Sequence, residues 1–78
     1  MLIFDKDKDT KEDQIADGQL ANISVQDVID KLATKFKVDE KMVKLFYPDK
    51  DTELTDFTKK LSEINFNYGD KVYSCVQT

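Results

Sequence analysis

Four side chains could act as nucleophiles: Cys75, Ser24, Ser62 and Ser74. A serine or cysteine nucleophile ordinarily needs a general base beside it, most often histidine, and the chain contains no histidine. Cys75 falls in an expected strand without a fixed cation, so its pKa is not expected to be lowered. The acids fall in expected loops and at helix ends, where solvent leaves a carboxyl pKa ordinary. The sequence therefore predicts a protein that is not an enzyme and carries no cofactor.

The acidic stretch Asp5-Lys-Asp-Lys-Asp9 has the alternating carboxylates of a calcium-binding loop. Such a loop also needs glycine at its sixth position and a bidentate acid at its twelfth. Counted from Asp5, these positions hold Thr10 and Ala16. We therefore expect residues 5–13 to form a mobile, solvated loop that binds no metal.

Charge and composition exclude two classes of partner. The 78 residues carry a net charge of −4 and include no arginine, so phosphate backbones and anionic lipid head groups are repelled. No apolar run approaches the roughly 20 residues of a membrane span. Cys75 is the single cysteine, which excludes an internal disulfide and favours a reducing compartment. We expect a cytoplasmic protein without a signal peptide that binds neither nucleic acid nor membrane.

The strongest structural signal is an amphipathic helix over residues 25–36. Its apolar residues recur at helical spacing along one face: Val25, Val28, Ile29, Leu32 and Phe36. Ser24 and Asp27 have the spacing of a capping box at its start. A lone amphipathic helix must bury its apolar stripe, and a small sheet provides the surface that covers it.

Strands are expected on both sides of this helix. Residues 1–4, 42–47 and 71–76 are short apolar or alternating segments, which are typical of strands. A further strand before the helix has the weakest signal, because Ile15 and Leu20 are its only large apolar residues. Gly18 indicates a bulge or bend in it.

Later in the chain, four apolar residues have helix-like spacing and predict a short helix or helical turn after Thr55: Leu54, Phe57, Leu61 and Ile64. Residues 67–70, which include Gly69, predict a turn before the last strand. The element order is strand, strand, helix, strand, short helix, strand. It predicts one α+β domain over residues 1–78, a β-grasp roll with a mixed sheet of four to five strands and one main helix packed across it.

Several segments resemble ubiquitin. Met1-Leu-Ile-Phe4 is similar to its opening strand, and residues 25–47 run in ubiquitin's register without a gap. Leu61-Ser-Glu-Ile-Asn-Phe66 resembles the short helical segment before the last strand, and Tyr68-Gly-Asp-Lys-Val72 the turn into that strand. The resemblance covers nearly the whole chain and implies a ubiquitin-like fold, on which many unrelated functions occur.

Within this family, the second half of the chain most resembles the ubiquitin-like domains of tubulin-folding cofactors, cofactor E first and cofactor B second. The similar features are the strand end Leu45-Phe46-Tyr47, the longer segment 48–54 and the ending 60–70. This resemblance implies a role in tubulin folding and in heterodimer assembly or disassembly. The implied partner is tubulin, or proteasome or chaperone machinery. Those cofactors also carry a CAP-Gly domain, and cofactor E leucine-rich repeats, which these 78 residues do not contain.

The resemblance further implies a protein-interaction patch on the sheet, formed by Lys44, Phe46, Tyr73 and Cys75. Phe46 takes the place of the central isoleucine of ubiquitin's patch, and Lys44 that of the basic residue beside it. Tyr73 takes the place of the histidine and Cys75 that of the valine. Strand alternation also places these four side chains outward if Val43, Leu45 and Val72 face inward. The alternative is that Phe46 and Tyr73 merely stack on each other across neighbouring strands.

Two departures from ubiquitin bear on function. Ser74 falls where ubiquitin buries a leucine, so a one-residue shift of the last strand, which would exchange its two faces, stays open. The chain ends Cys75-Val-Gln-Thr78 without the diglycine that conjugation requires. We expect a monomeric, non-catalytic protein-interaction domain that is not conjugated to other proteins. A free-standing small accessory protein of the bacterial type VII secretion kind and a truncated ubiquitin-like modifier are the alternatives.

Overall fold

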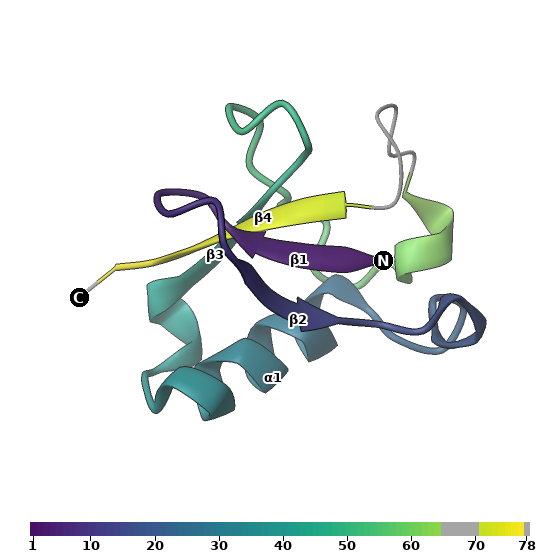
Figure 1. Cartoon of the computed structure of the whole chain (residues 1–78). Coiled ribbons are helices and arrows are strands. Elements are labelled where there is room, and N and C mark those ends of the chain that lie inside the picture. Colours follow the sequence, from purple (N-terminus) through teal and green to yellow (C-terminus); the bar gives the residue numbers. More distant parts are fainter. Residues whose placement is uncertain (65–70, 78) are drawn as a thin grey trace.

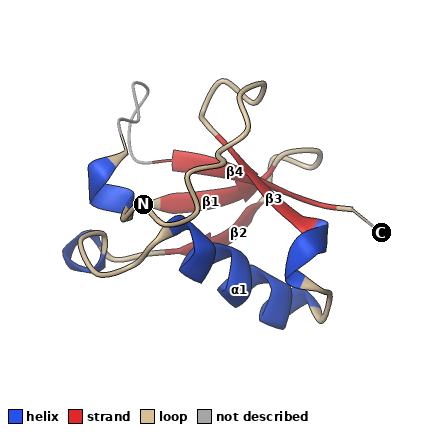
Figure 2. Ribbon diagram, turned by 180° about the vertical axis from the view of Figure 1, so that it is seen from behind, coloured by secondary structure: helices blue, strands red, loops and turns tan. Residues whose placement is uncertain are grey.

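The computed structural model describes residues 1–64 and 71–77, which form a four-stranded mixed sheet with one main helix across it (Figures 1 and 2). The elements are β1 (Leu2–Asp5), β2 (Lys11–Gln14), α1 (Val25–Phe36), β3 (Val43–Phe46) and β4 (Lys71–Val76). Three short 3₁₀ turns complete them: η1 (Asp17–Gln19), η2 (Glu40–Met42) and η3 (Leu61–Glu63). The strand order is β2-β1-β4-β3. β1 and β4 are parallel and the other two pairs antiparallel, so the predicted α+β, β-grasp arrangement is confirmed.

Helix α1 has the predicted bounds and the predicted cap. Ser24 Oγ accepts a hydrogen bond from the Asp27 N–H at 3.2 Å, and Asp27 Oδ2 accepts one from the Ser24 N–H at 3.0 Å. The N–H groups of Val25 and Gln26 donate to carbonyls of the segment at residues 57–59. These contacts satisfy N–H groups that the first turn of a helix leaves without a partner in the helix itself. The helix ends at Lys37, whose φ of 59° lies in the left-handed region.

The core lies between α1 and the inner face of the sheet. Helix residues at the predicted spacing meet alternate strand residues, and the fully covered side chains among them are Ile3, Val25, Val28, Leu32, Leu45 and Val72. Leu54, Leu61 and Ile64 close the core beside the helix. Burial of this apolar surface is the main favourable contribution to folding in a chain of this size.

The last strand is not shifted. Val72 and Ser74 are both buried on the inner side, and Ser74 Oγ donates to the Phe4 carbonyl at 3.3 Å. Leu45 on β3 lies opposite Ser74, so both strands turn the same face to the core. A serine is accepted at this buried position because its hydroxyl has a hydrogen-bond acceptor within reach.

Strand β2 lies where a mobile loop was predicted, and this prediction is wrong for residues 11–13. Lys11–Gln14 pairs with β1, with Asp13 opposite Ile3. The bulge lies between Ile3 and Phe4 on β1 rather than at Gly18, which belongs to η1. β2 is an edge strand whose backbone pairing needs no apolar side chains, so its sequence carries no apolar pattern.

Of the short helix or helical turn predicted after Thr55, the structure has the turn, a single 3₁₀ turn at Leu61–Glu63. The Leu54 N–H donates to the Leu45 carbonyl, which holds this buried residue beside β3. Phe57 is 44% exposed and does not belong to the core. The helix-like spacing therefore reflects separate core contacts of Leu54, Leu61 and Ile64. The turn predicted at residues 67–70 lies outside the described residues. Within residues 1–64 and 71–77, no helix combines the length and apolar character needed to cross a membrane.

Candidate protein-interaction surface

Three aromatic residues form a row across the sheet on the face opposite α1. Phe4 of β1 and Phe46 of β3 are both Cα partners of Tyr73 on β4, which lies between them. Because alternate residues of each strand are buried against the helix, these three point to the other side. The rings of Phe4 and Tyr73 pack with centroids 6.2 Å apart and an interplanar angle of 40°.

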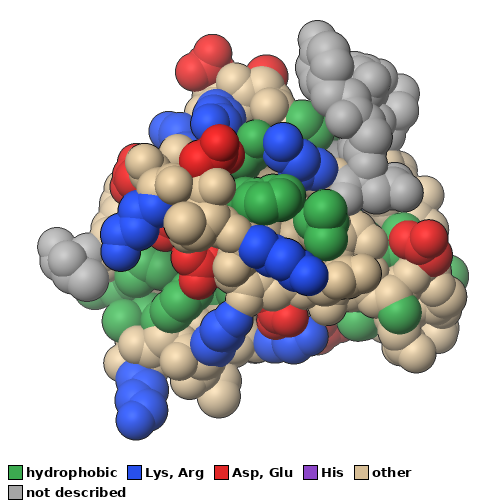
Figure 3. Space-filling view, viewed as in Figure 1, with side chains coloured by type: hydrophobic (Ala, Val, Ile, Leu, Met, Phe, Trp, Pro, Cys, Tyr) green, Lys and Arg blue, Asp and Glu red, His purple; other side chains and the backbone are tan. Residues whose placement is uncertain are grey.

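Three lysines cover this row with their ammonium groups. Lys6 Nζ lies 4.3 Å from the Phe46 ring centroid. Lys50 Nζ lies 4.6 Å from the centroid of Tyr73. Lys71 Nζ lies 5.1 Å from both Phe4 and Tyr73. We call the six residues Phe4, Phe46, Tyr73, Lys6, Lys50 and Lys71 the outer-face cluster. In Figure 3, hydrophobic side chains lie between basic ones on this face.

Two aspartates fold the turns that bring Lys6 and Lys50 to the face. Asp5 Oδ1 accepts hydrogen bonds from the N–H groups of Asp7 and Lys8, each at 2.8 Å. In the turn after β3, Asp49 Oδ1 accepts hydrogen bonds from the N–H groups of Asp51 and Thr52, at 2.8 and 2.9 Å. These backbone bonds lower the pKa of the Asp49 carboxyl. In the loop that suggested calcium, the Asp5 carboxylate therefore holds the backbone, and no group of three ligating side chains among the described residues could hold a metal ion.

Lys44 and Phe46, two residues of the predicted patch, are half-buried on the outer face as expected. Lys44 Nζ forms an ion pair with Glu53 at 3.7 Å. The ammonium of Lys6 lies over the Phe46 ring. The ring of Tyr73 packs against Phe4 on its other side. Phe46 is half-buried at the edge of the aromatic row, so part of its side chain stays accessible beside Lys6.

Tyr73 differs from the prediction, because its side chain is buried to 4% exposure instead of being an exposed anchor. Alternation gave its direction correctly, but the neighbours Lys50, Lys71 and Phe4 cover the ring. A central strand position has neighbours on both sides, and long lysine side chains can lay their methylenes along such a ring. Tyr73 is therefore the base of the cluster, with Phe4 and Phe46 at its flanks.

Cys75 lies on the outer face beside Lys44 and is half-buried. Its Sγ lies 3.9 Å from Asp7 Oδ2. Burial raises the pKa of the Cys75 thiol, and the negative charge of Asp7 raises it further. A raised pKa keeps the group protonated near neutral pH, which is unfavourable for a nucleophile.

The outer-face cluster carries an excess of positive charge. Lys50 forms an ion pair with Asp9 at 3.6 Å, and both groups are largely solvated. Among the described residues, no carboxylate forms an ion pair with Lys6 or Lys71. The pKa of Lys71 is raised, first by hydrogen bonding with Tyr73, so its ammonium stays charged at neutral pH. The rings of this face thus lie beside lysine ammonium groups, and the Asp9 carboxylate lies near both Lys50 and Lys71.

The comparisons with known proteins add no relative. The chain matches no protein-family model, and no curated protein matches it.

Sequence reasoning did not include Phe4, Lys6, Lys50 and Lys71 in the patch. Phe4 could have been found, because a strand with Ile3 facing inward places its neighbour outward. The three lysines lie at strand ends or in turns, where no periodicity indicates the direction of a side chain.

Proposed function

We propose that the chain is a non-catalytic protein-interaction domain that docks through the outer-face cluster. The observation that carries this proposal is the row of three aromatic residues with lysine ammonium groups 4.3 to 5.1 Å from its rings. Aromatic side chains near the centre of an interface often contribute most of the binding energy. The raised pKa of the Cys75 thiol supports a binding role over a catalytic one.

The partner that fits this face offers an apolar side chain flanked by carboxylates. The apolar group would contact Phe46, and the carboxylates would lie near Lys6 and Lys71. A chain with net charge −4 repels acidic partners in general, so a local group of cations determines which face they approach.

For the biological process we propose tubulin folding, with tubulin or the proteasome or chaperone machinery as partner. This proposal rests on the resemblance of segments 45–54 and 60–70 to the ubiquitin-like domains of tubulin-folding cofactors. It is separate from the proposed docking face, which rests on geometry. The domain would then bind its partner through the outer-face cluster and leave the partner covalently unchanged.

Binding to purified αβ-tubulin, measured by biolayer interferometry, tests the proposed partner. Three proteins are compared: wild type, Phe46→Ala, and Phe57→Ala as a matched aromatic truncation away from the cluster. We expect wild type and Phe57→Ala to bind equally and Phe46→Ala to bind at least about tenfold more weakly, as for an interface hot spot. Absence of binding by all three would refute tubulin as the direct partner. Equal binding by all three would keep tubulin and refute the docking face.

A further inference from the structure

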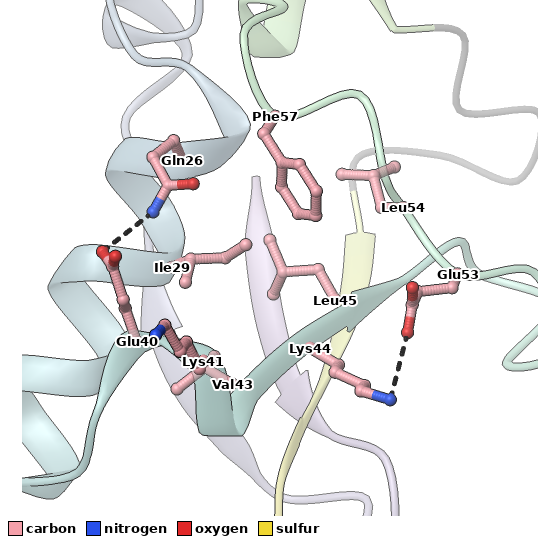
Figure 4. A pocket seen from close by; sticks show the side chains of 10 residues that line it. All are labelled: Gln26, Ile29, Glu40, Lys41, Val43, Lys44, Leu45, Glu53, Leu54 and Phe57. Carbon is pink, nitrogen blue, oxygen red and sulfur yellow. Dashed lines mark hydrogen bonds and ion pairs between the residues drawn. The ribbon is translucent and has the colours of Figure 1, made fainter.

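A pocket of about 220 Å³ lies between α1, β3 and the segment around Phe57 (Figure 4). None of the six outer-face cluster residues lines it. Its floor is apolar and consists of buried side chains: Ile29, Val43, Leu45 and Leu54. The Phe57 ring forms one wall, is 44% exposed and points toward Ile29 and Leu45 in Figure 4. An aromatic side chain with nearly half its surface in water leaves apolar area for a ligand to cover.

The wall is fixed in place by the first turn of α1. The Phe57 carbonyl accepts a hydrogen bond from the Gln26 N–H, and the Lys59 carbonyl accepts one from Val25, each at 3.0 Å. These two helix N–H groups need acceptors in any case. The pocket is therefore formed before any ligand binds, which lowers the entropic cost of binding.

Glu40 and Lys41 line one end of the pocket, and the Asp30 carboxylate lies next to Glu40, just outside the lining. The Gln26 side-chain amide donates from Nε2 to Asp30 Oδ1 at 3.0 Å and to Glu40 Oε2 at 3.2 Å, the second contact being drawn in Figure 4. Hydrogen bonding with Asp30 and the negative charge of that residue raise the pKa of Glu40, and Lys41 offsets this only in part. At the other end, Lys44 and Glu53 form an ion pair, so those two charges balance each other.

The size of the pocket limits what it can accept. An apolar protein cavity of about 150 Å³ binds benzene, so a pocket of about 220 Å³ has room for one ring with a small substituent. A planar cation on that ring would reach the Glu40 end, where its N–H groups could donate to carboxylate oxygens. An anion there would meet the Glu40 carboxylate, whose negative charge the neighbouring Asp30 reinforces.

We propose that this pocket is a second binding site, which takes a flat apolar group bearing a planar cation. The floor and Phe57 hold the ring, and Glu40 attracts the cation, with the negative charge of Asp30 behind it. The proposal does not depend on the outer-face cluster, because the two sites are lined by different residues.

Three isosteric probes test the site: benzamidine, benzamide and benzoate, which share a ring and differ in charge. Each is titrated into the ¹⁵N-labelled protein, and backbone and side-chain amide shifts are followed by NMR. We expect saturable shifts at Gln26, Ile29 and Phe57, with benzamidine binding about fivefold more tightly than benzamide and benzoate more weakly still. Added salt should reduce the preference for benzamidine over benzamide, because the charges are near the surface.

Two variants separate the parts of the site. Glu40→Gln keeps an acceptor for Gln26 and removes one charge, so the preference for benzamidine should fall at least about twofold. Phe57→Ala should weaken the binding of all three probes. Phe46→Ala, on the other face, should leave the affinity for each probe unchanged. Equal binding of the three probes by the wild-type protein, or benzamidine shifts confined to residues outside the pocket, would overturn the proposal. A circular dichroism spectrum of each variant verifies that it is folded.

Discussion

The Lys6 ammonium lies 4.3 Å from the centroid of the Phe46 ring. Lys6 follows β1 and Phe46 belongs to β3, and β4 lies between these two strands in the sheet. The contact joins the turn after β1 to the edge strand β3 across the whole outer face. Cation–π contacts of this kind contribute about 0.5–1 kcal/mol at exposed sites. Their main effect here is to hold the lysines next to the rings, so that charge and apolar surface are offered together.

Tyr73→Ala should destabilise the domain much more than Phe46→Ala. The Tyr73 side chain is buried on a central strand, and truncation of a buried aromatic residue costs about 3 kcal/mol or more. Phe46 is half-buried on an edge strand, where a cost of about 1 kcal/mol is expected. Urea unfolding followed by circular dichroism measures both free energies. Equal losses would mean that Tyr73 is as exposed as alternation alone suggested.

Ser24→Ala should lower the free energy of unfolding by about 1 kcal/mol, because it removes the side-chain acceptor of the capping box. Exposed Ser62, outside α1, provides the control: Ser62→Ala should change stability by less than about 0.5 kcal/mol. The same urea titration gives both values. A Ser24→Ala protein as stable as wild type would show that the carbonyls of residues 57–59 suffice to cap the helix.

Acid should destabilise the protein partly through Asp49. Its pKa is lowered in the folded chain by hydrogen bonds from Thr52 and Asp51, so the folded state favours the ionised carboxylate. This contribution to stability is present above the unfolded pKa of about 4 and is lost as pH falls through the lower folded pKa. We expect Asp49→Asn to lose less stability than wild type between pH 5 and pH 2 in urea titrations.

Part of the acid sensitivity should remain in Asp49→Asn, because Asp27 also has a lowered pKa, caused first by the backbone hydrogen bond from Ser24. Identical pH profiles for wild type and Asp49→Asn would contradict the role given to the Asp49 turn.

Local sequence signals predicted the elements whose side chains face the core. The bounds of α1 follow from the spacing of Val25 to Phe36 and from Ser24 as its cap, and β4 has the predicted ends. The second strand was predicted from Ile15 and Leu20, but β2 lies earlier in the chain, at Lys11–Gln14. Its position was not evident because an edge strand can be paired through its backbone alone, as Asp13 opposite Ile3 shows. Three of the four predicted patch residues, Lys44, Phe46 and Cys75, are half-buried on the outer face, whereas Tyr73 is buried.

The rest of the surface depends on contacts between distant segments. Tyr73 is buried by Lys50 and Phe4, which come from a turn and from another strand. No pattern within the last strand could indicate that cover. The pocket beside Phe57 likewise needs α1, β3 and the segment after β3 together, whereas spacing predicted only a short helix or helical turn after Thr55.

The docking role of the outer face is tested most directly by quantitative affinity capture from the source's own cell extract. Wild type, Phe46→Ala and Phe57→Ala are immobilised at equal density, and retained proteins are quantified by mass spectrometry. We predict proteins that are retained equally by wild type and Phe57→Ala and are depleted at least about tenfold from Phe46→Ala. If no retained protein is depleted from folded Phe46→Ala relative to wild type, the outer-face cluster is not the docking surface.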